Sequence, residues 1–275
     1  MIKRVSLAIC AAVWLLGLFS CGQDDEAATA EVSVSLSAVV PQESLLRSVS
    51  DYGTGGRVNR CILEVYRNGV RYGERQVQAV TAGQVSFPEL LLVPMQTYDF
   101  VLWADCADGL DDGYYNTADL SSVSARKPYT GNDDGFDAFC ARFSCTVTES
   151  FTQSITLTRP FAQLCVTASD IDASTPDASK PTHAQVDFAA IPTAFNLLTG
   201  EPVDSQPISY TVAVENVDAG EMTVDYIWVA PEQDDMVQFA VTLFRDGTML
   251  APARNFEEVP LRRNYRTNVS AGFLP

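Results

Sequence analysis

Residues 31–40 read EVSVSLSAVV, and apolar and polar side chains alternate along most of this stretch. Successive residues of a β-strand point to opposite faces of a sheet, so a period of two predicts a strand with one buried face. The side chains predicted on that face are Val32, Val34, Leu36, Ala38 and Val40. This stretch therefore leads us to expect a β fold for the chain that follows it.

Further strand-like segments follow at short intervals, among them YDFVLWAD at 98–105 and MVQFAVTLFRDGTML at 236–250. Asn68-Gly69 and Asp246-Gly247 predict tight hairpins, because both dipeptides favour the type I′ turn between antiparallel strands. The best helix candidate is the stretch at residues 116–123, which is short. Many short strands without a long helical period predict an all-β protein made of two tandem antiparallel β-sandwich domains.

Arg159-Pro160 marks the expected boundary between the sandwiches, because proline cannot continue a central strand. The predicted domains are residues 48–159 and 160–275. Two short similarities suggest that these halves are related: FVLWAD at 100–105 with DYIWVAP at 225–231, and VYRNG at 65–69 with LFRDG at 243–247. Trp103 and Trp228 lie within these apolar strands, so we expect both rings in the core rather than on a sugar-binding surface.

The first twenty residues, MIKRVSLAICAAVWLLGLFS, have the order of a secretory signal. Lys3 and Arg4 precede an apolar run over residues 7–19, which is shorter than the stretch of about 20 apolar residues that spans a membrane as a helix. The run ends at LFSC, which resembles a bacterial lipobox. We therefore expect signal cleavage before Cys21 and acylation of its thiol, with an ordinary cleaved signal as the alternative.

Three acidic residues follow the lipid cysteine: Asp24, Asp25 and Glu26. They resemble the export signal that certain Gram-negative bacteria use to send lipoproteins to the cell surface. An acidic linker is the alternative. The expected location is the outer membrane, with the protein held by its lipid and facing outward.

The composition limits the partners and the covalent cross-links of the chain. Eighteen lysines and arginines stand against 35 acidic residues, a net charge of −17. Nucleic acid and anionic lipid repel such a chain, so neither is expected as a partner. Five cysteines remain after the lipobox, an odd number in an exported protein, and we expect small buried hydrophobic residues rather than disulfides. They are Cys61, Cys106, Cys140, Cys145 and Cys165.

The sequence offers little for catalysis. His183 is the single histidine, and it lies in the polar, proline-containing segment KPTHAQ, where a solvated loop is expected. No nucleophile elbow, zinc motif or phosphate-binding glycine loop is present. We therefore expect no catalytic residues, no cofactor and no enzyme activity.

Two acidic loops could contribute oxygen ligands for calcium. The first contains Asp105, Asp108, Asp111 and Asp112, and the second contains Asn132, Asp133, Asp134 and Asp137. Neither spacing matches the EF-hand pattern. A solvated loop is the favoured interpretation for both, with calcium binding by the first loop as the alternative.

Two segments carry a resemblance to a known family. LRRNYRTNVSAGFL, residues 261–274, resembles the closing strand of fimbrillin-like proteins, and SITLTRPFAQLCV, residues 154–166, resembles the junction between their sandwich domains. These proteins are surface lipoproteins and type V pilus subunits of Gram-negative anaerobes. The resemblance implies transthyretin-like β-sandwiches and a role in fimbriae and cell adhesion.

The resemblance also implies a mechanism of assembly. Fimbrillins are trimmed after an arginine, lose their first strand, and accept a strand from the next subunit in its place. Here residues 21–47 correspond to the acidic linker and the removable strand, and Arg47 is the expected cleavage site, with Arg57 as the alternative. The expected partners are other fimbrial subunits or a second copy of the chain. A monomeric surface lipoprotein that binds glycan or host protein, with or without calcium, stays the alternative.

Overall fold

The computed structural model describes residues 31–42, 52–231 and 235–275. The strands before residue 160 are β1 (Val32–Val39), β2 (Arg60–Arg67), β3 (Val70–Arg71), β4 (Gln76–Ala79), β5 (Gln84–Leu92), β6 (Gln96–Asp105), β7 (Tyr115–Asn116), β8 (Val123–Ala125), β9 (Phe139–Val147) and β10 (Phe151–Thr156). The later strands are β11 (Phe161–Ala168), β12 (His183–Asn196), β13 (Glu201–Ala213), β14 (Glu221–Trp228), β15 (Asp235–Arg245), β16 (Thr248–Met249), β17 (Arg254–Leu261) and β18 (Arg266–Ala271). Three single-turn 3-10 helices accompany them: η1 (Asp134–Phe136), η2 (Asp177–Ser179) and η3 (Val217–Ala219). The prediction of an all-β sandwich protein is confirmed.

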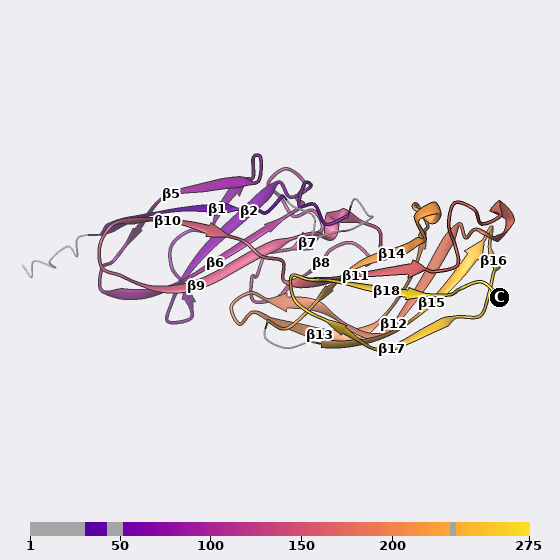
Figure 1. Ribbon diagram of the computed structural model, residues 1–275. Coiled ribbons are helices and arrows are strands. Elements are labelled where there is room, and N and C mark those ends of the chain that lie inside the picture. Colours follow the sequence, from indigo (N-terminus) through magenta and orange to yellow (C-terminus); the bar gives the residue numbers. More distant parts are fainter. Residues whose placement is uncertain (1–30, 43–51, 232–234) are drawn as a thin grey trace, which may run out of the picture. The chain divides into compact units, whose positions relative to one another are not determined.

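Two sheets enclose the core of the N-terminal half. One has the order β10-β1-β5, and the other has the order β3-β2-β6-β9 with β4 also paired to β2. Figure 1 shows β1, β5 and β10 together in indigo to pink. Alternate side chains of both sheets, such as Leu36, Phe87, Leu63 and Phe100, meet in one buried cluster. Tight interdigitation of two inner faces is what makes this pair of sheets a sandwich.

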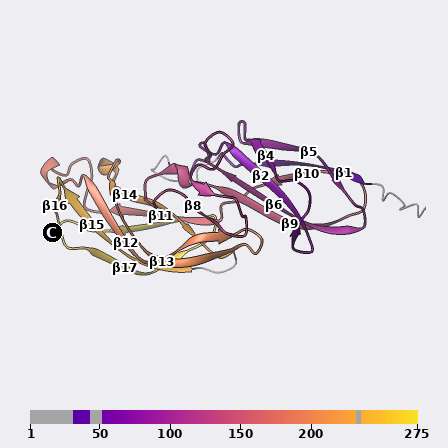
Figure 2. The same ribbon diagram turned by 180° about the vertical axis from the view of Figure 1, so that it is seen from behind.

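Two further sheets enclose the core of the C-terminal half. The smaller has the order β14-β11-β18, and the larger has the order β16-β15-β12-β8-β7 with β13 paired to β12 and β17 paired to β15. Figure 2 shows β12, β13, β15 and β17 in orange to yellow. Inner side chains of both sheets, among them Leu164, Val186, Phe239 and Leu261, form a second buried cluster.

A third cluster covers the outer face of β2 and β6. Trp103 is fully buried there, and its ring lies 5.9 Å from that of Trp228. Phe195 stacks on Trp228 with 5.1 Å between the ring centroids. Both tryptophans are therefore core residues, as predicted. Because β2 and β6 are buried on both faces, their sequences read as nearly continuous apolar runs.

The division into domains at residue 160 stays a proposal. Residues of β8 pair with residues of β12, with Val123 opposite Phe195, so one sheet contains strands from both predicted halves. The third cluster likewise joins side chains from before and after residue 160. Two sandwiches divided at Arg159-Pro160 would thus share a sheet and a core cluster.

The sheets are not purely antiparallel, which corrects one part of the expectation. β1 runs parallel to β10 and antiparallel to β5, and β11 runs parallel to β18 and antiparallel to β14. In each half, therefore, the first strand has two neighbours. One is the last strand of that half, which runs parallel to it, and the other runs antiparallel. A parallel pair needs a long connection, and here the intervening strands of each half provide it.

Both predicted hairpins are confirmed. Asn68 and Gly69 have φ values of 52° and 75°, and Arg67 pairs with Val70 across the turn. Asp246 and Gly247 have φ values of 50° and 81° between β15 and β16. Positive φ at both central positions is the requirement of a type I′ turn.

The predicted helix at residues 116–123 is wrong. The segment forms turns, in which Asp119 Oδ1 accepts a hydrogen bond of 2.8 Å from Ser121 N, and Thr117 Oγ1 donates to Asp112 at 2.6 Å. Such short polar side chains bond to nearby backbone groups and compete with helix formation. The tryptophan similarity is also not a structural repeat, because Trp103 lies on β6 of a five-stranded sheet and Trp228 lies on β14 of a three-stranded one.

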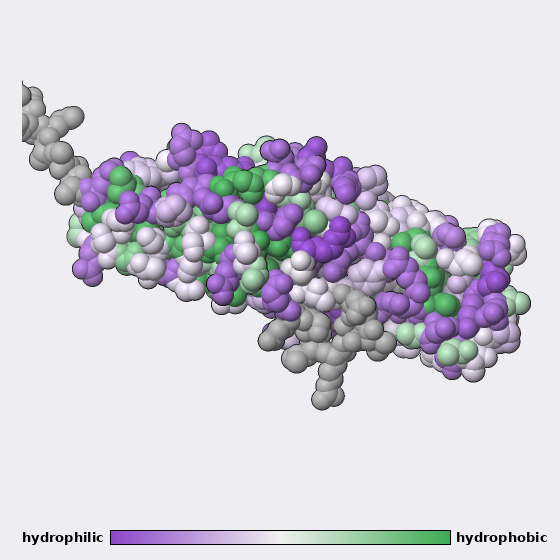
Figure 3. Space-filling view, turned by 90° about the horizontal axis from the view of Figure 1, so that it is seen from above, coloured by the Kyte–Doolittle hydropathy of each residue, from purple (hydrophilic) through white to green (hydrophobic). Residues whose placement is uncertain are grey.

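In the described ranges, no helix is long and apolar enough to cross a membrane. On the face shown in Figure 3, hydrophobic patches are interspersed with hydrophilic ones.

Candidate functional site

The first strand, β1, is a central strand rather than an edge strand. Its residues pair with β5 on one side, with Ser37 opposite Ser86, and with β10 on the other, with Ser37 opposite Ser154. Both edges of the strand therefore take part in hydrogen-bonded ladders. Taking β1 away would open a slot between β5 and β10.

One face of β1 is buried in the sandwich core. Val34, Leu36, Ala38 and Val40 are each at most 2% exposed, while Val32 is half-buried at the start of the strand. Burying a valine or leucine side chain stabilises by about 1.5–3 kcal/mol, so this face contributes of the order of 5 kcal/mol or more. The floor of the slot under β1 is accordingly apolar.

The end of β1 is held by backbone hydrogen bonds. Val40 N donates to Gly83 O at 2.8 Å, and Leu157 N donates to Val39 O at 2.9 Å. The chain then passes Pro41 and Gln42, whose side chain Nε2 donates to Gly55 O at 3.2 Å. These bonds fix the strand in register at the end where the connection to residue 52 begins.

The next described residues are 52–55, which we call the strap. Gly53 N donates to Asp134 Oδ1 at 2.7 Å, and Gly55 N donates to Asp137 Oδ2 at 3.1 Å. Gly53 O accepts a hydrogen bond of 2.6 Å from Arg159 Nη2. The strap is thus tied to side chains from the loop before β9 and from the segment before β11.

Further bonds tie the strap to the C-terminal half. Arg266 Nη2 donates to Tyr52 O at 2.9 Å, and Tyr52 OH donates to Glu215 at 2.8 Å. Burial, followed by the bond to Glu215, raises the pKa of the Tyr52 hydroxyl well above its usual value. Gly53 and Gly55 have φ values of 79° and 72°, a conformation that side chains with a Cβ rarely adopt. The strap therefore has one defined conformation, which its hydrogen bonds and its two glycines fix.

A buried ion pair lies beneath the strap. Arg159 Nε and Nη2 donate to the two carboxylate oxygens of Asp137 at 2.6 and 2.8 Å, and both side chains are almost fully buried. The Arg159 guanidinium also lies 4.3 Å from the centre of the Phe139 ring. Burial raises the pKa of the Asp137 carboxyl, while the Arg159 hydrogen bonds act in the opposite direction. This pair joins the segments that precede β9 and β11 to the strap.

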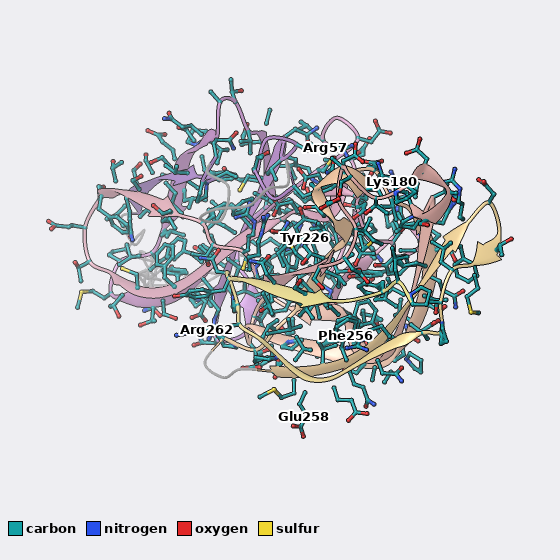
Figure 4. The ribbon with its side chains drawn as sticks, turned by 45° about the vertical axis from the view of Figure 1, so that its right-hand side comes forward. Arg57, Lys180, Tyr226, Phe256, Glu258 and Arg262 are labelled. Atoms are coloured by element: carbon teal, nitrogen blue, oxygen red, sulfur yellow. The ribbon has the colours of Figure 1, made fainter. Side chains whose placement is uncertain are left out.

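Tyr226 belongs to the same network from β14. Its hydroxyl donates to Asp134 and accepts from Gln163 Nε2 at 3.3 Å, and burial raises its pKa well above the usual value. Figure 4 labels Tyr226 in the interior of the molecule and Arg57 near the upper rim.

Arg57, the alternative cleavage site, lies in an exposed turn directly after the strap. Its Nη1 donates to Asp133 Oδ1 at 3.2 Å, and its guanidinium lies 5.8 Å from the centre of the Tyr114 ring. The predicted lipid site Cys21, the acidic residues Asp24, Asp25 and Glu26, and Arg47 lie outside the described residues. Those five assignments therefore stay predictions.

The four weak calcium candidates, all aspartates of the first acidic loop, lie in two different environments. Asp105 is fully buried, accepts two bonds from Arg60 at 2.7 and 2.9 Å, and accepts a third from the Trp103 indole at 3.0 Å. Asp112 accepts from Arg60 Nη1 at 3.0 Å. The first loop is therefore not simply solvated, because two of its carboxylates neutralise a buried arginine.

Asp108 and Asp111, the other two candidates, form an isolated antiparallel bridge with each other at the exposed tip of that loop. In the ranges that the structure describes, no group of three or more histidine, cysteine or acidic side chains is arranged to hold a metal ion. The interpretation of the second acidic loop as solvated is wrong for Asp137, which is buried against Arg159, while Asn132, Asp133 and Asp134 are partly exposed.

Sequence reasoning missed both buried ion pairs, although a signal was present. Arg60 precedes the apolar residues CIL, and Arg159 lies between TLT and PFA, so each is a charge in a largely apolar context. Buried charges in proteins are almost always paired. The partners, Asp105 and Asp137, likewise lie beside apolar residues, but spacing alone does not say which arginine meets which aspartate.

The five cysteines described by the structure are all free thiols. Cys61, Cys106, Cys140 and Cys165 are buried, and Cys145 is partly buried. The prediction of small buried hydrophobic residues is confirmed for the first four. His183, at the start of β12, is exposed and its Nδ1 is 3.1 Å from Thr182 Oγ1.

The sequence of the chain matches one known protein family. A family model described as "Family of unknown function (DUF6562)" matches residues 24–275, and the chain belongs to that family. No protein with a curated description matches it in sequence.

Several solved structures share its fold, and two of them illustrate the similarity. One, titled as a candidate polysaccharide-binding protein from Bacteroides thetaiotaomicron, is 11% identical, with a TM-score of 0.53 over 87% of this chain and 90% of that one. The other, titled as a candidate adhesin from Bacteroides ovatus, is 11% identical, with a TM-score of 0.52 over 87% of both chains. Neither they nor the family is described as an enzyme.

Proposed function

We propose that this protein is a lipid-anchored surface protein of the outer membrane that acts as a structural or adhesive fimbrial subunit. Its assembly would proceed by strand exchange: a protease cuts after an arginine, β1 leaves, and a strand of another subunit takes its place. The lipobox at Cys21 and the resemblance to fimbrillin-like proteins support the location. A solved structure of the same fold, titled as a candidate adhesin, supports the adhesive role.

One observation carries the proposal: β1 is the first described strand and fills a central slot of the sandwich. It is followed at once by the connection from Pro41 to Tyr52, within which Arg47 lies. A cut in that connection separates β1 from everything except the hydrogen bonds and apolar contacts in its slot. Those are the contacts that a strand from another chain would replace.

The strap favours Arg47 over Arg57 as the cut. Cleavage after Arg47 leaves residues 52–55 on the trimmed chain, bonded to Asp134, Asp137 and Arg159. Cleavage after Arg57 would remove the strap together with β1. The buried Arg159 and Asp137 would then each lose a backbone partner, which is costly for groups out of contact with water.

Mild trypsin treatment of the purified chain tests this assignment. We expect a product that begins at Ser48, and we expect it to associate with itself or with co-expressed subunits, while the uncut chain stays monomeric on size exclusion. Arg47→Ala should abolish both the cut and the association, and Arg57→Ala should leave both unchanged. A product beginning at Ser48 that stays monomeric with and without partner subunits would contradict strand exchange and leave the monomeric surface lipoprotein as the function.

The lipid anchor gives a second test. We expect Cys21→Ser to release the protein from outer-membrane fractions, because stable anchoring requires two or more acyl chains and the substitution removes the acylated thiol. Cys61→Ser is the matched control, since that cysteine is buried in the first core. Labelled palmitate that fails to enter the wild-type protein would contradict the anchor. We also expect replacement of Asp24, Asp25 and Glu26 by alanine to move the protein from the cell surface to the inner face, and protease shaving of intact cells measures this. A triple variant that is shaved as readily as the wild type would make the acidic stretch only a linker.

A further inference from the structure

The structure contains a basic cavity that none of the preceding roles uses. It has a volume of about 700 Å³ and lies beside β9 and β10, next to the turn between β12 and β13. Two arginines line it, Arg142 from β9 and Arg263 from the turn before β18, and none of its described lining residues is acidic. In a chain with 35 acidic residues and a net charge of −17, such a lining is unusual.

The turn at residues 197–200 brings the two arginines together. Asn196 Oδ1 accepts from Leu198 N and Thr199 N at 2.9 and 3.1 Å, and Gly200 N donates to Asn196 O at 2.7 Å. The turn is thereby held in one shape. Arg142 Nη1 donates to Thr199 O at 3.1 Å, and Arg263 Nη1 donates to Gly200 O at 3.4 Å. Two guanidinium groups thus bond to consecutive backbone carbonyls.

Arg263 is held by further contacts. Its Nη2 donates to Cys140 Sγ at 3.2 Å, and its guanidinium lies 5.4 Å from the centre of the Phe195 ring. Neither Arg263 nor Arg142 forms an ion pair with a described carboxylate. A guanidinium has five N–H donors, and these bonds use only one for Arg142 and two for Arg263. Most of the donors of these two cations, which line one cavity and bond to consecutive carbonyls, therefore stay available.

Adjacent guanidinium groups repel one another, and a carboxylate between them removes that repulsion through charge-assisted hydrogen bonds. The net charge of −17 opposes the approach of a polyanion, so the fitting ligand carries one acidic group on an otherwise neutral molecule. The β10 wall of the cavity presents amide and hydroxyl side chains, Gln153, Ser154 and Thr156, all exposed. These groups match the hydroxyls of a saccharide.

We propose that this cavity binds the sugar-acid residue of a glycan, with its carboxylate between Arg142 and Arg263. The ring of Phe143, half-buried and stacked on Phe100 at 4.8 Å, supplies the apolar surface beside the hydroxyl-bearing wall. The inference deepens the adhesive part of the proposed function and rests on it. It does not depend on strand exchange, because the cavity is complete in the uncut chain.

The test uses a trisaccharide ending in glucuronate, immobilised on a biosensor, against the same trisaccharide ending in glucose. We expect the uncut, monomeric protein to bind the first at least tenfold more tightly than the second, and added salt to weaken the binding. Arg142→Gln and Arg263→Gln should each reduce binding at least tenfold. Arg254→Gln is the matched control, since Arg254 is exposed on β17 and does not line the cavity.

Equal binding of the two trisaccharides, or no binding of either, would overturn the proposal. So would binding that survives both cavity substitutions. A short peptide with a free carboxyl terminus is run in parallel, and binding of that peptide in place of the glucuronate probe would assign the cavity to a protein partner instead. Melting temperatures of the variants show whether each is folded, and Arg142→Gln, on an exposed side chain, separates lost binding from lost structure.

Discussion

Replacing Arg159 by methionine is expected to lower the free energy of unfolding by about 3–5 kcal/mol, because it leaves the Asp137 carboxylate buried without its cation. Asp137 is 1% exposed and accepts two bonds from Arg159, so water cannot take the place of the lost partner. For a chain of this size, such a loss lowers Tm by roughly 10 °C. Chemical denaturation followed by circular dichroism measures it.

Two further variants identify the cause. Arg159→Met combined with Asp137→Leu should recover most of the stability, because replacing both members of a buried pair by apolar residues is often nearly neutral. Arg57→Met removes an exposed ion pair to Asp133 and should change the free energy by no more than about 1 kcal/mol. If the double variant is no more stable than Arg159→Met, the loss arises from the strap bond to Gly53 rather than from the unpaired charge.

The second large effect concerns Asp225 on β14. Its side chain is fully buried, its Oδ1 accepts from Tyr210 at 2.5 Å and from Tyr129 at 3.2 Å, and its Oδ2 has no hydrogen-bond partner among the described residues. Burial raises the pKa of this carboxyl to about 6, with the bonds from Tyr210 and Tyr129 acting against the rise.

A raised pKa means that the folded state holds a proton that the unfolded chain releases near pH 4. This contribution to stability is therefore complete below about pH 4 and is lost as the pH rises through 6. The loss amounts to about 3 kcal/mol, since one pKa unit corresponds to 1.36 kcal/mol. Asp225→Asn cannot ionise, so the variant should gain stability over the wild type between pH 4.5 and pH 7.5, by up to that amount.

Urea denaturation of both proteins at pH 4.5, 6.0 and 7.5 gives the difference directly, and the contributions of the other carboxyls cancel in it. Tyr210→Phe tests the same assignment in the other direction. The variant loses a hydrogen bond to the carboxylate, which should raise the pKa of Asp225 further and enlarge the loss of stability between pH 4.5 and pH 7.5. A difference between wild type and Asp225→Asn that stays constant across the three pH values would contradict the assignment.

The sequence predicted the elements of this fold better than their arrangement. Alternation along residues 31–40 and the Asn-Gly and Asp-Gly dipeptides are local signals, and the strand and both hairpins follow from them. The position of β1 between β5 and β10 is not local, since its neighbours in the sheet are about 50 and 120 residues away in sequence. No periodicity in one strand reports which edges pair with it.

In the candidate site, too, the local features could be predicted from the sequence and the long-range contacts could not. The buried face of β1 follows from residue types, whereas the strap depends on contacts between residue 53 and residues 134 and 159. The acidic loops show the limit clearly. Asp105 and Asp108 are alike in sequence context, yet one is buried against Arg60 and the other lies at an exposed tip, because only the fold decides which carboxylate meets a cation.

The mixed pairing of β1 has a consequence for how subunits would join. Its slot has two unlike walls: β10 accepts a neighbour that runs parallel, and β5 accepts one that runs antiparallel. The two ladders place their hydrogen bonds differently, so a strand inserted in the reverse direction would mismatch both walls at once. Under the proposed strand exchange, an incoming strand would therefore enter with one orientation, which would give the resulting filament a fixed polarity. A subunit that kept its own first strand would offer no slot and would end the filament.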